Sequence, residues 1–315
     1  MQRTITVAQH SGSTVFPVPE NSRLRMQLRW PFFRKINHNE SNFVMPLDMS
    51  LLPYRSRISA AADLPPYQGV PSPYIILGTE RSGTTVIAEG LYSTGQAGCP
   101  HEYEGPGQKK LLMERWNVFT SEDYLAHLFR YRTTPNGIWG IKILAHTIDQ
   151  AATLYLLEQY RPVYIYIFRK NKIEQAVSRF KAKYTDAWTE SLHRSRKKIF
   201  NKDYSFQKIL ECFKFCLDSE QTILTFISNK KAMINKFMYE DMRNDIVGHV
   251  CHVCNNILNI YIKRDNIDIS HMVIQKNTLS EYFIERFIKD FFRFQFDVDS
   301  HVNQALCAII KEFYA

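Results

Sequence analysis

No apolar run in this chain of 315 residues approaches the roughly 18–20 residues that a helix needs to cross a bilayer. The first residues also lack the basic stretch followed by an apolar stretch that marks a secretory signal. The chain has only 6 cysteines, too few for a disulfide scaffold at this length. These absences predict a cytoplasmic protein without an integral membrane segment.

The chain has an excess of basic over acidic residues. The formal net charge of +9 leaves three anionic partners open, namely nucleic acid, a membrane surface or a small polyanionic ligand. Hydrophobic residues make up 45% of the chain, which is ordinary for a globular protein with a buried core. The length fits one large domain or two small ones. Composition therefore predicts a globular protein and does not choose its partner.

Residues 1–70 differ from the rest of the chain. They contain scattered prolines and arginines and no sustained helical period, and they end in the proline-rich stretch Leu64–Pro71. We predict that residues 1–70 are an N-terminal extension that packs partly on the main body. Its function cannot be read from the sequence. Residues 71–315 are predicted to form the main domain.

From Tyr74 onward, short apolar runs alternate with helical patterns. Almost uniformly apolar runs suit strands that are covered on both faces, as in a parallel sheet. The alternation predicts an α/β fold, a three-layer sandwich with a central parallel sheet and ligands at the carboxyl ends of its strands. The predicted strands are Tyr74–Leu77, Ile138–Leu144, Val163–Phe168 and Lys236–Tyr239; the predicted helices include Val86–Tyr92, Ile148–Gln159, Ile173–Lys183 and a long amphipathic helix from Ile246 to Leu258.

A glycine-bearing turn joins the first strand to the first helix. Gly78 and Gly83 have the Gly-x4-Gly spacing of a nucleotide-binding loop, but Thr84 stands where an ATPase carries lysine. The free amides and the dipole at the helix start make this turn an anion cradle. Arg81 adds a fixed positive charge. The pattern predicts a site for one anionic bridge, formed by Arg81, Ser82, Gly83, Thr84 and Thr85.

A second anion site is predicted at the end of the third strand. Arg169 follows that strand directly, and Asn171 is a candidate N-cap for a helix that carries Ser178. A guanidinium and a hydroxyl suit a terminal phosphate. The alternative is an exposed arginine and a helix serine without a ligand. Because this pair lies one strand–helix unit from the first loop, we favour a nucleotide that is phosphorylated at two ends.

A loop acid completes the pattern. The glycines and proline of Gly95–Tyr103 exclude a continued helix, so Glu102 lies on a loop that returns toward the site. A carboxylate within hydrogen-bond reach of an acceptor hydroxyl could remove its proton. The alternative for Glu102 is a solvated loop acid. Lys142, near the end of the second strand, is either a second cation of the site or a surface lysine.

The order and spacing of these motifs resemble those of the bacterial trehalose 2-sulfotransferase-like family. The resemblance spans residues 72–290. It is carried by Thr79–Tyr103, Thr134–Lys142, Arg169 with Gln175–Ser178, and Trp188, and more weakly by Tyr239–Met242 and Gln275–Glu281.

The resemblance implies a P-loop-like sulfotransferase fold and the transfer of a sulfuryl group from 3′-phosphoadenosine 5′-phosphosulfate (PAPS) to a sugar hydroxyl. In that scheme the loop Arg81–Thr85 holds the 5′-phosphosulfate, and Arg169 with Ser178 holds the 3′-phosphate. Glu102 is the general base, and Arg81 stabilises charge on the departing oxygen. Lys276 could reach the 3′-phosphate from the C-terminal part. The resemblance also implies a possible homodimer.

The acceptor is expected to be a carbohydrate or glycolipid. Compared with the family pattern, Glu80 replaces a neutral polar residue and puts a second acid beside the base. The segment between Glu102 and Asn136 is short, so trehalose itself should not be assumed as the acceptor. The residues expected near the acceptor are Glu80, Cys99, His101, Glu102, Tyr103 and Lys142.

Two other functions compete with this reading. A P-loop nucleotide kinase is disfavoured by Thr84 and by the lack of a persuasive magnesium-binding carboxylate at a strand end. A non-catalytic RNA-binding protein is disfavoured because no aromatic stacking motif accompanies the basic run His193–Lys198. We expect no nucleic-acid partner. We also expect no metal, since Cys254 falls on an apolar helix stripe; the residues considered for zinc are His249, Cys251, His252 and Cys254, with Cys212 and Cys216 as a second pair.

Overall fold

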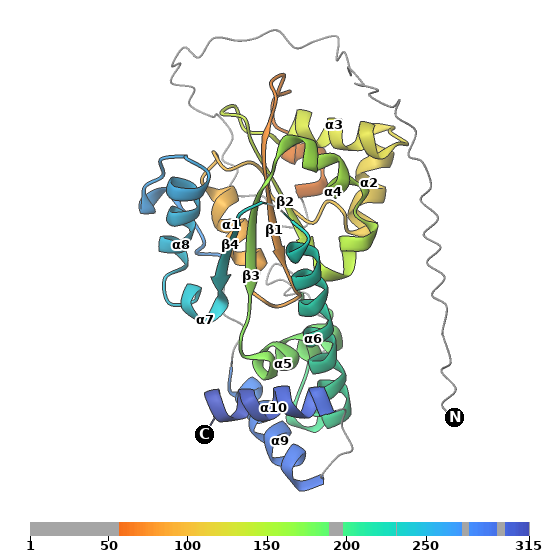
Figure 1. Cartoon of the computed structure of the whole chain (residues 1–315), viewed down its shortest axis with the longest axis vertical. Helices are drawn as coiled ribbons and strands as arrows, with labels where there is room; N and C mark the ends of the chain where they lie inside the picture. Colours follow the sequence, from red (N-terminus) through yellow and green to blue (C-terminus); the bar gives the residue numbers. More distant parts are fainter. Residues whose placement is uncertain (1–56, 189–197, 231, 273–276, 295–299, 315) are drawn as a thin grey trace, which may run out of the picture. The chain divides into compact units, whose positions relative to one another are not determined.

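A parallel sheet organises the protein. The computed structural model describes residues 57–188, 198–230, 232–272, 277–294 and 300–314. Within these residues, four strands pair in the order β2-β1-β3-β4, and every pair is parallel (Figure 1). The strands are β1 Ser72–Gly78, β2 Ile138–Leu144, β3 Val163–Phe168 and β4 Ile234–Met238.

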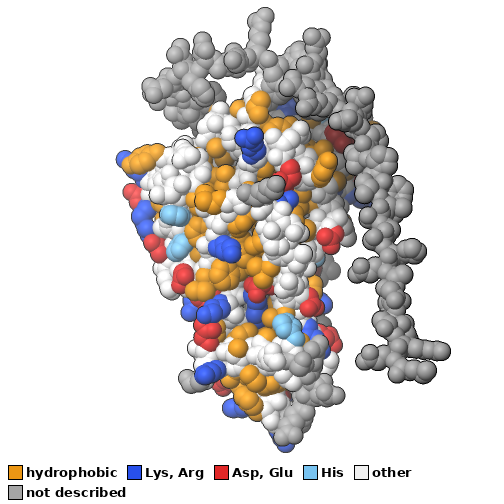
Figure 2. All heavy atoms as spheres, viewed as in Figure 1, with side chains coloured by type: hydrophobic (Ala, Val, Ile, Leu, Met, Phe, Trp, Pro, Cys, Tyr) orange, Lys and Arg blue, Asp and Glu red, His pale blue; other side chains and the backbone are white. Residues whose placement is uncertain are grey.

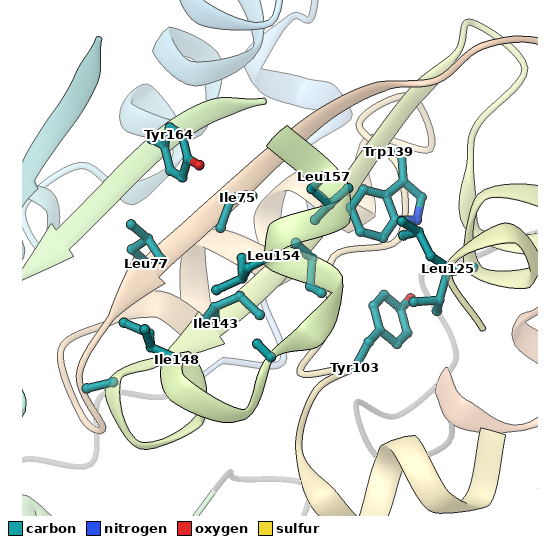
Figure 3. Packing of buried hydrophobic residues seen from close by; sticks show 14 of the residues in the cluster. Ile75, Leu77, Tyr103, Leu125, Trp139, Ile143, Ile148, Leu154, Leu157 and Tyr164 are labelled. Carbon is teal, nitrogen blue, oxygen red and sulfur yellow. The ribbon is translucent and has the colours of Figure 1, made fainter. Parts of the chain in front are cut away.

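Helices cover both faces of the sheet. On one face, Ile75 of β1 and Trp139 of β2 pack with α3 (Ser121–Arg132), α4 (Ala152–Leu157) and the second half of α6 (Phe206–Ser228) (Figure 3). On the other face, alternate strand residues such as Ile76 and Ile165 pack with α1 (Thr84–Ser93) and α8 (Ile246–His252). Because successive strand residues point to opposite faces, a strand that is covered on both faces, such as β3, is apolar or aromatic along its length. The predicted three-layer α/β sandwich is confirmed.

A separate helical core lies beyond the carboxyl end of β3. Buried residues of α5 (Lys172–Thr185) and the first half of α6 pack with residues of α9 (Thr278–Phe294) and α10 (Ser300–Phe313). Figure 1 shows these helices grouped together. Phe283 and Phe287 of α9 are fully buried in this core. The core fixes the position of α5, which is the helix that follows Arg169.

The last residues of the predicted extension belong to the packed body. Ala62 and Leu64 are buried, and Arg57 forms a bidentate ion pair with Glu89 of α1 at 2.6 and 2.5 Å. The Arg57 guanidinium also lies 3.6 Å from the ring centroid of Tyr92. These contacts tie residues 57–64 to the helix that follows the anion loop.

Several predicted elements need adjustment. The single helix expected at Ile148–Gln159 is wrong, because a 3-10 segment (η4, Ala145–Gln150), α4 and a further 3-10 turn (η5, Glu158–Tyr160) replace it. The break falls at Ala151, whose ψ of 76° leaves the helical region. Strand β4 begins two residues earlier than predicted, and Tyr239 starts α7 (Tyr239–Met242). The long helix is α8 continued by a π-helical turn, Val253–Ile257.

Three further points complete the fold. Most of the predicted extension, the run His193–Lys197 and Lys276 lie outside the described residues. None of the helices among the described residues is long and apolar enough to span a membrane. The remaining helices and short turns are α2 Pro106–Trp116, η3 Ala60–Ala62, η7 Asn201–Asp203 and η9 Arg264–Asn266.

Candidate active site

The anion loop connects β1 to α1 as predicted. Gly83 is the N-cap of α1 with a φ of 94°, and Arg81 has a φ of 63°. These left-handed residues turn the chain so that the first amides of α1, which have no partner within the helix, face the carboxyl edge of the sheet. The Ser82 side chain is fully buried and donates to the carbonyl of Thr79 at 2.8 Å. Ser82 therefore shapes the loop through its side chain.

Glycine is required at position 83. A Cβ on Gly83 would lie 2.5 Å from the Tyr239 ring, and the positive φ disfavours any side chain. Tyr239 in turn lies under the guanidinium of Arg169, with 4.6 Å from its ring centroid to Cζ. The close approach of Gly83 thus couples the anion loop to the arginine at the end of β3.

The two predicted anion sites share contacts. The Nε of Arg81 donates to Oγ of Ser178 at 2.9 Å, and the Arg81 guanidinium also donates to the carbonyl of Trp188. Arg169 donates to the carbonyl of Arg81 at 3.4 Å. Burial and the nearby charge of Arg169 lower the pKa of Arg81 to about 10. Arg81, which the sequence assigned to the 5′ side, therefore lies with Arg169 and Ser178.

Arg169 is held in place by acids. It is 8% exposed and forms an ion pair with Glu174 at 2.5 Å, while Glu240 lies 4.0 Å away. The side chain of Asn171 accepts from the Glu174 amide at 3.1 Å, so the predicted N-cap of α5 is confirmed. This cap starts α5 at a point that places Glu174 beside Arg169. The ion pairs therefore hold the Arg169 guanidinium in a fixed position, mostly shielded from solvent.

Lys181 was missed by the sequence reasoning. It lies three residues after Ser178 on α5, so the two share a helix face. Its Nζ donates to Asn277 at 2.9 Å and to Ser280 at 2.6 Å. Burial and the charge of Arg81 lower the pKa of Lys181 to about 8. A third cation therefore stands close to Arg81 with hydroxyl and amide partners.

Glu102 and Lys142 meet at the other side of the loop. Lys142 Nζ lies 2.6 Å from Glu102 Oε1 and donates to Thr85 Oγ1 at 2.9 Å. Burial raises the pKa of Glu102, but the charge and hydrogen bond of Lys142 outweigh it, with smaller contributions from His101 and His146, so the pKa is lowered. The alternative of Lys142 as a surface lysine is wrong, since it is 1% exposed.

Three residues expected near the acceptor face the interior. Cys99 and Tyr103 are fully buried, and Figure 3 shows Tyr103 beside Leu125 in the core. The Tyr103 hydroxyl donates to the Cys99 carbonyl, which closes this part of the loop. His101 is 1% exposed, and its carbonyl accepts from the Lys142 amide at 3.0 Å. This burial corrects the predicted acceptor contacts of Cys99, His101 and Tyr103. Their side chains instead support the backbone that presents Glu102.

Glu80 points toward α5. Its Oε2 accepts from Arg179 Nε at 2.6 Å, and its Oε1 lies 3.6 Å from Nδ1 of His146. Gln175 donates to the Glu80 carbonyl and to the Thr79 hydroxyl, both at 2.7 Å. The Glu80 carboxylate, predicted as a second acid beside the base, is thus balanced by Arg179. The sequence reading did not single out His146, which contacts Glu80.

Two of the cysteines considered for zinc, Cys254 and Cys216, pack as apolar residues. Cys254 is fully buried in the core beneath α8, and burial raises its pKa to about 12. Cys216 is equally buried on α6, with its pKa also raised to about 12 by burial. Within the described ranges, no three His, Cys, Asp or Glu side chains are grouped so as to hold a metal ion.

Comparison with known families agrees with the arrangement of these elements. The model of the Stf0 sulphotransferase family matches residues 73–290. The match extends from the second residue of β1 into α9, so it includes the anion loop, Glu102, Lys142, Arg169 and Ser178. The chain belongs to the Stf0 sulphotransferase family.

Two relatives match part of the chain. The chain is 27% identical over 157 residues to trehalose 2-sulfotransferase of Mycobacterium tuberculosis, covering 37% of this chain and 58% of that protein. It is 28% identical over 158 residues to trehalose 2-sulfotransferase of Mycolicibacterium smegmatis, covering 38% and 59%. The chain thus spans less than two thirds of either relative. A sulfotransferase structure from Alicyclobacillus acidocaldarius aligns with a TM-score of 0.40 at 13% identity, covering 71% of this chain and 94% of that one.

Proposed function

We propose that this protein transfers a sulfuryl group from PAPS to a hydroxyl group of a carbohydrate or glycolipid. The observation that carries the proposal is the distribution of charge around one loop. Arg81, Arg169 and Lys181 gather on the α5 side, while the Lys142–Glu102 pair lies on the β2 side. A donor with anionic groups at two positions and an acceptor that must lose a proton fit such a site.

The cation cluster favours the 3′-phosphate of the donor. The charge of Arg169 helps to lower the pKa of Arg81, and the charge of Arg81 helps to lower the pKa of Lys181. A dianionic phosphate would relieve this repulsion between like charges. Ser178 adds a hydroxyl to the same cluster through its bond to Arg81. In this proposal the amides of residues 81–85 hold the 5′-phosphosulfate, and Arg81 lies between the two anionic groups.

The Lys142–Glu102 pair is proposed to serve the transfer itself. The acceptor oxygen attacks sulfur, and the bond from sulfur to the bridging oxygen of the 5′-phosphate breaks, with its electron pair passing to that oxygen. The acceptor proton passes to the Glu102 carboxylate. Lys142 and the amides at the start of α1 stabilise negative charge that develops on the sulfuryl and bridging oxygens. Lys142 also fixes the carboxylate through their 2.6 Å contact.

The acceptor class follows from the relatives. Both matched relatives are named for sulfation of trehalose, a sugar. The region between Glu102 and β2 holds α2 and α3 here. We therefore propose a carbohydrate or glycolipid hydroxyl, and a labelled-donor assay against a panel of sugars and glycolipids tests it.

Neither alternative function gains support. Family membership does not favour a nucleotide kinase or an RNA-binding protein. On the face shown in Figure 2, Lys and Arg side chains are interspersed with Asp and Glu, whereas a nucleic-acid surface gathers one sign of charge. Magnesium-dependent phosphate transfer, or RNA binding that survives Arg169→Ala, would restore one of them.

Adenosine 3′,5′-bisphosphate is expected to raise the melting temperature, because a ligand that binds only the folded state stabilises it. Arg169→Ala should reduce this shift markedly, since it removes the guanidinium beside Arg81. Thermal unfolding with and without the bisphosphate measures both effects. Arg161→Ala, at an exposed turn before β3, is the matched control. If Arg169→Ala showed the same increase in melting temperature as the parent, Arg169 would be excluded from the proposed donor site.

Lys181→Met is expected to weaken the binding of adenosine 3′,5′-bisphosphate by about tenfold, because loss of one charge-assisted hydrogen bond costs about 1.5 kcal/mol or more. Adenosine 5′-phosphate, which lacks the 3′-phosphate, should bind the variant and the parent alike. Calorimetric titration with both ligands measures the difference. Equal loss for the two ligands would mean that Lys181 acts on the fold of α5 and not on the 3′-phosphate.

A further inference from the structure

The short helix α7, which follows β4, lies beside the turn that carries Arg169. Phe168 of β3 pairs with Met238 of β4, and these are the last residues of their strands. The residues that follow them therefore occupy equivalent positions at the carboxyl edge of the sheet. Arg169 and Tyr239 come one residue later, and the Arg169 guanidinium lies 4.6 Å from the Tyr239 ring centroid. The same register places α7 against the turn that joins β3 to α5.

Glu240 of α7 holds the backbone of this turn. Its Oε2 accepts from the Lys170 amide at 3.1 Å, and its Oε1 accepts from the Asn171 amide at 2.9 Å. These two amides directly follow Arg169 and precede α5. Hydrogen bonds to a charged acceptor are stronger than neutral ones, and the helix dipole favours a carboxylate at a helix N-terminus. The Glu240 side chain is only 11% exposed, so water competes little for these bonds.

This arrangement leaves an Arg169 donor for a ligand. Glu240 Oε1 lies 4.0 Å from Arg169 Nε, which is beyond hydrogen-bond distance. Nε is buried and has no hydrogen-bond partner among the residues that the structure describes. The rest of the guanidinium is oriented by the Glu174 carboxylate and the Arg81 carbonyl. An acid bound directly to Nε would compete with an anionic ligand, whereas Glu240 directs its oxygens to the backbone.

Other contacts at this turn hold side chains. The Asn171 side chain donates to the Tyr314 hydroxyl at 2.9 Å. The Lys170 ammonium forms an ion pair with Glu312 of α10. The backbone amides of the same two residues are bound by Glu240. Because an amide has a single hydrogen to donate, loss of Glu240 would leave two donors at this turn without their acceptor.

We propose that Glu240 is a positioning residue for the donor, which fixes the backbone of the β3–α5 turn so that Arg169 faces the 3′-phosphate. The inference rests on the proposed function, in which Arg169 binds that phosphate. Glu240 itself does not touch the phosphate. Its negative charge, close to a site for a dianion, by itself disfavours binding. Its contribution to donor binding is therefore made through the backbone that carries Arg169.

Glu240→Ala is expected to weaken the binding of adenosine 3′,5′-bisphosphate by about tenfold, the effect of losing one charge-assisted hydrogen bond from a displaced Arg169. Adenosine 5′-phosphate, which lacks the 3′-phosphate, should bind the variant and the parent alike. Glu240→Gln keeps one carbonyl oxygen for one of the amides and should retain more affinity than Glu240→Ala. Calorimetric titration measures these affinities. Removal of an acid alone would tighten phosphate binding, so the sign of the effect separates positioning from charge.

A double-variant cycle tests whether Glu240 acts through Arg169. In an Arg169→Ala background, Glu240→Ala should cause no further loss of bisphosphate binding. Asp241→Ala, which removes an exposed acid from the next position of α7, is the matched control and should bind both nucleotides like the parent. Three results would each overturn the proposal: equal losses for the two nucleotides, additive losses in the double variant, or bisphosphate binding in Glu240→Ala that is unchanged or tighter.

A second readout needs neither donor nor acceptor. Crystal structures of the parent and Glu240→Ala should differ at the β3–α5 turn, with the Arg169 guanidinium displaced from the face of Tyr239 in the variant. If the parent binds no bisphosphate, the proposed function fails, while this comparison still decides whether Glu240 positions Arg169. An Arg169 side chain that keeps its place over Tyr239 in Glu240→Ala overturns the inference.

Discussion

Glu102→Gln is expected to slow sulfuryl transfer by about 10²–10⁴-fold, the usual contribution of a general base. The amide cannot take the acceptor proton, yet it keeps the shape and one oxygen of the side chain, so Lys142 retains a polar partner. Adenosine 3′,5′-bisphosphate should still raise the melting temperature, because the cations around Arg169 lie on the α5 side of the loop. Single-turnover rates with labelled PAPS measure the first effect, and thermal unfolding measures the second.

The matched control is Glu114→Gln. Glu114 is exposed on α2 and pairs only loosely with Lys110 at 3.9 Å, so its neutralisation should leave the rate unchanged. Full activity in Glu102→Gln would exclude it as the base. A variant that lost both the rate and the bisphosphate shift would place Glu102 in donor binding, contrary to the division of the site proposed above.

The sheet could be predicted from sequence because its strands are covered on both faces. β3 (Val163–Phe168) is an unbroken run of apolar and aromatic residues. Its bounds, and the position of Arg169 at its carboxyl end, could therefore be predicted from the sequence. The α5 cap at Asn171 was visible too, since its hydrogen bond is local in sequence. Elements fixed by local chemistry and two-sided burial were therefore predictable.

Contacts between distant segments were not predictable in the same way. The sequence shows Lys142 as a lone charge in an apolar strand, but its partner Glu102 lies 40 residues earlier on a loop. That loop follows a path set by Gly98, whose Cα approaches β2 so closely that a Cβ would lie 3.0 Å from the Gly140 nitrogen. The same path turns Tyr103 into the core, where the sequence reading had expected an acceptor contact.

The cation cluster of Arg81, Arg169 and Lys181 could likewise be predicted only in part. Arg169 was identified because it follows a strand, whereas Lys181 looked like any helix lysine. Its partners Asn277 and Ser280 come from a segment almost 100 residues later, which packs on α5 through the buried face of α9. The spacing from Ser178 to Lys181 was the one local signal, and by itself i,i+3 spacing also describes a solvated helix face.

Lys142→Met is expected to cost about 3 kcal/mol of stability at pH 7, the low end for breaking a buried ion pair, because Glu102 keeps 27% of its side-chain surface exposed. The lysine lowers the pKa of Glu102 in the folded protein, so its contribution is present above the unfolded value of 4.5 and is lost as pH falls through the lower folded value. The difference between parent and variant should therefore shrink on acidification. Urea unfolding at pH 7 and near pH 4 measures it.

The double variant Lys142→Met with Glu102→Gln separates charge from packing. Removing the stranded carboxylate should recover most of the stability lost in Lys142→Met, as two neutral groups of similar volume replace a charge without a partner. Lys110→Met, at an exposed position of α2, should change stability by no more than about 0.5 kcal/mol. A loss that is the same at both pH values and is not recovered in the double variant would mean that Lys142 acts through the packing of its methylene groups. In that case its charge would not hold Glu102 as a carboxylate, and the electrostatic basis for a base at this position would fail.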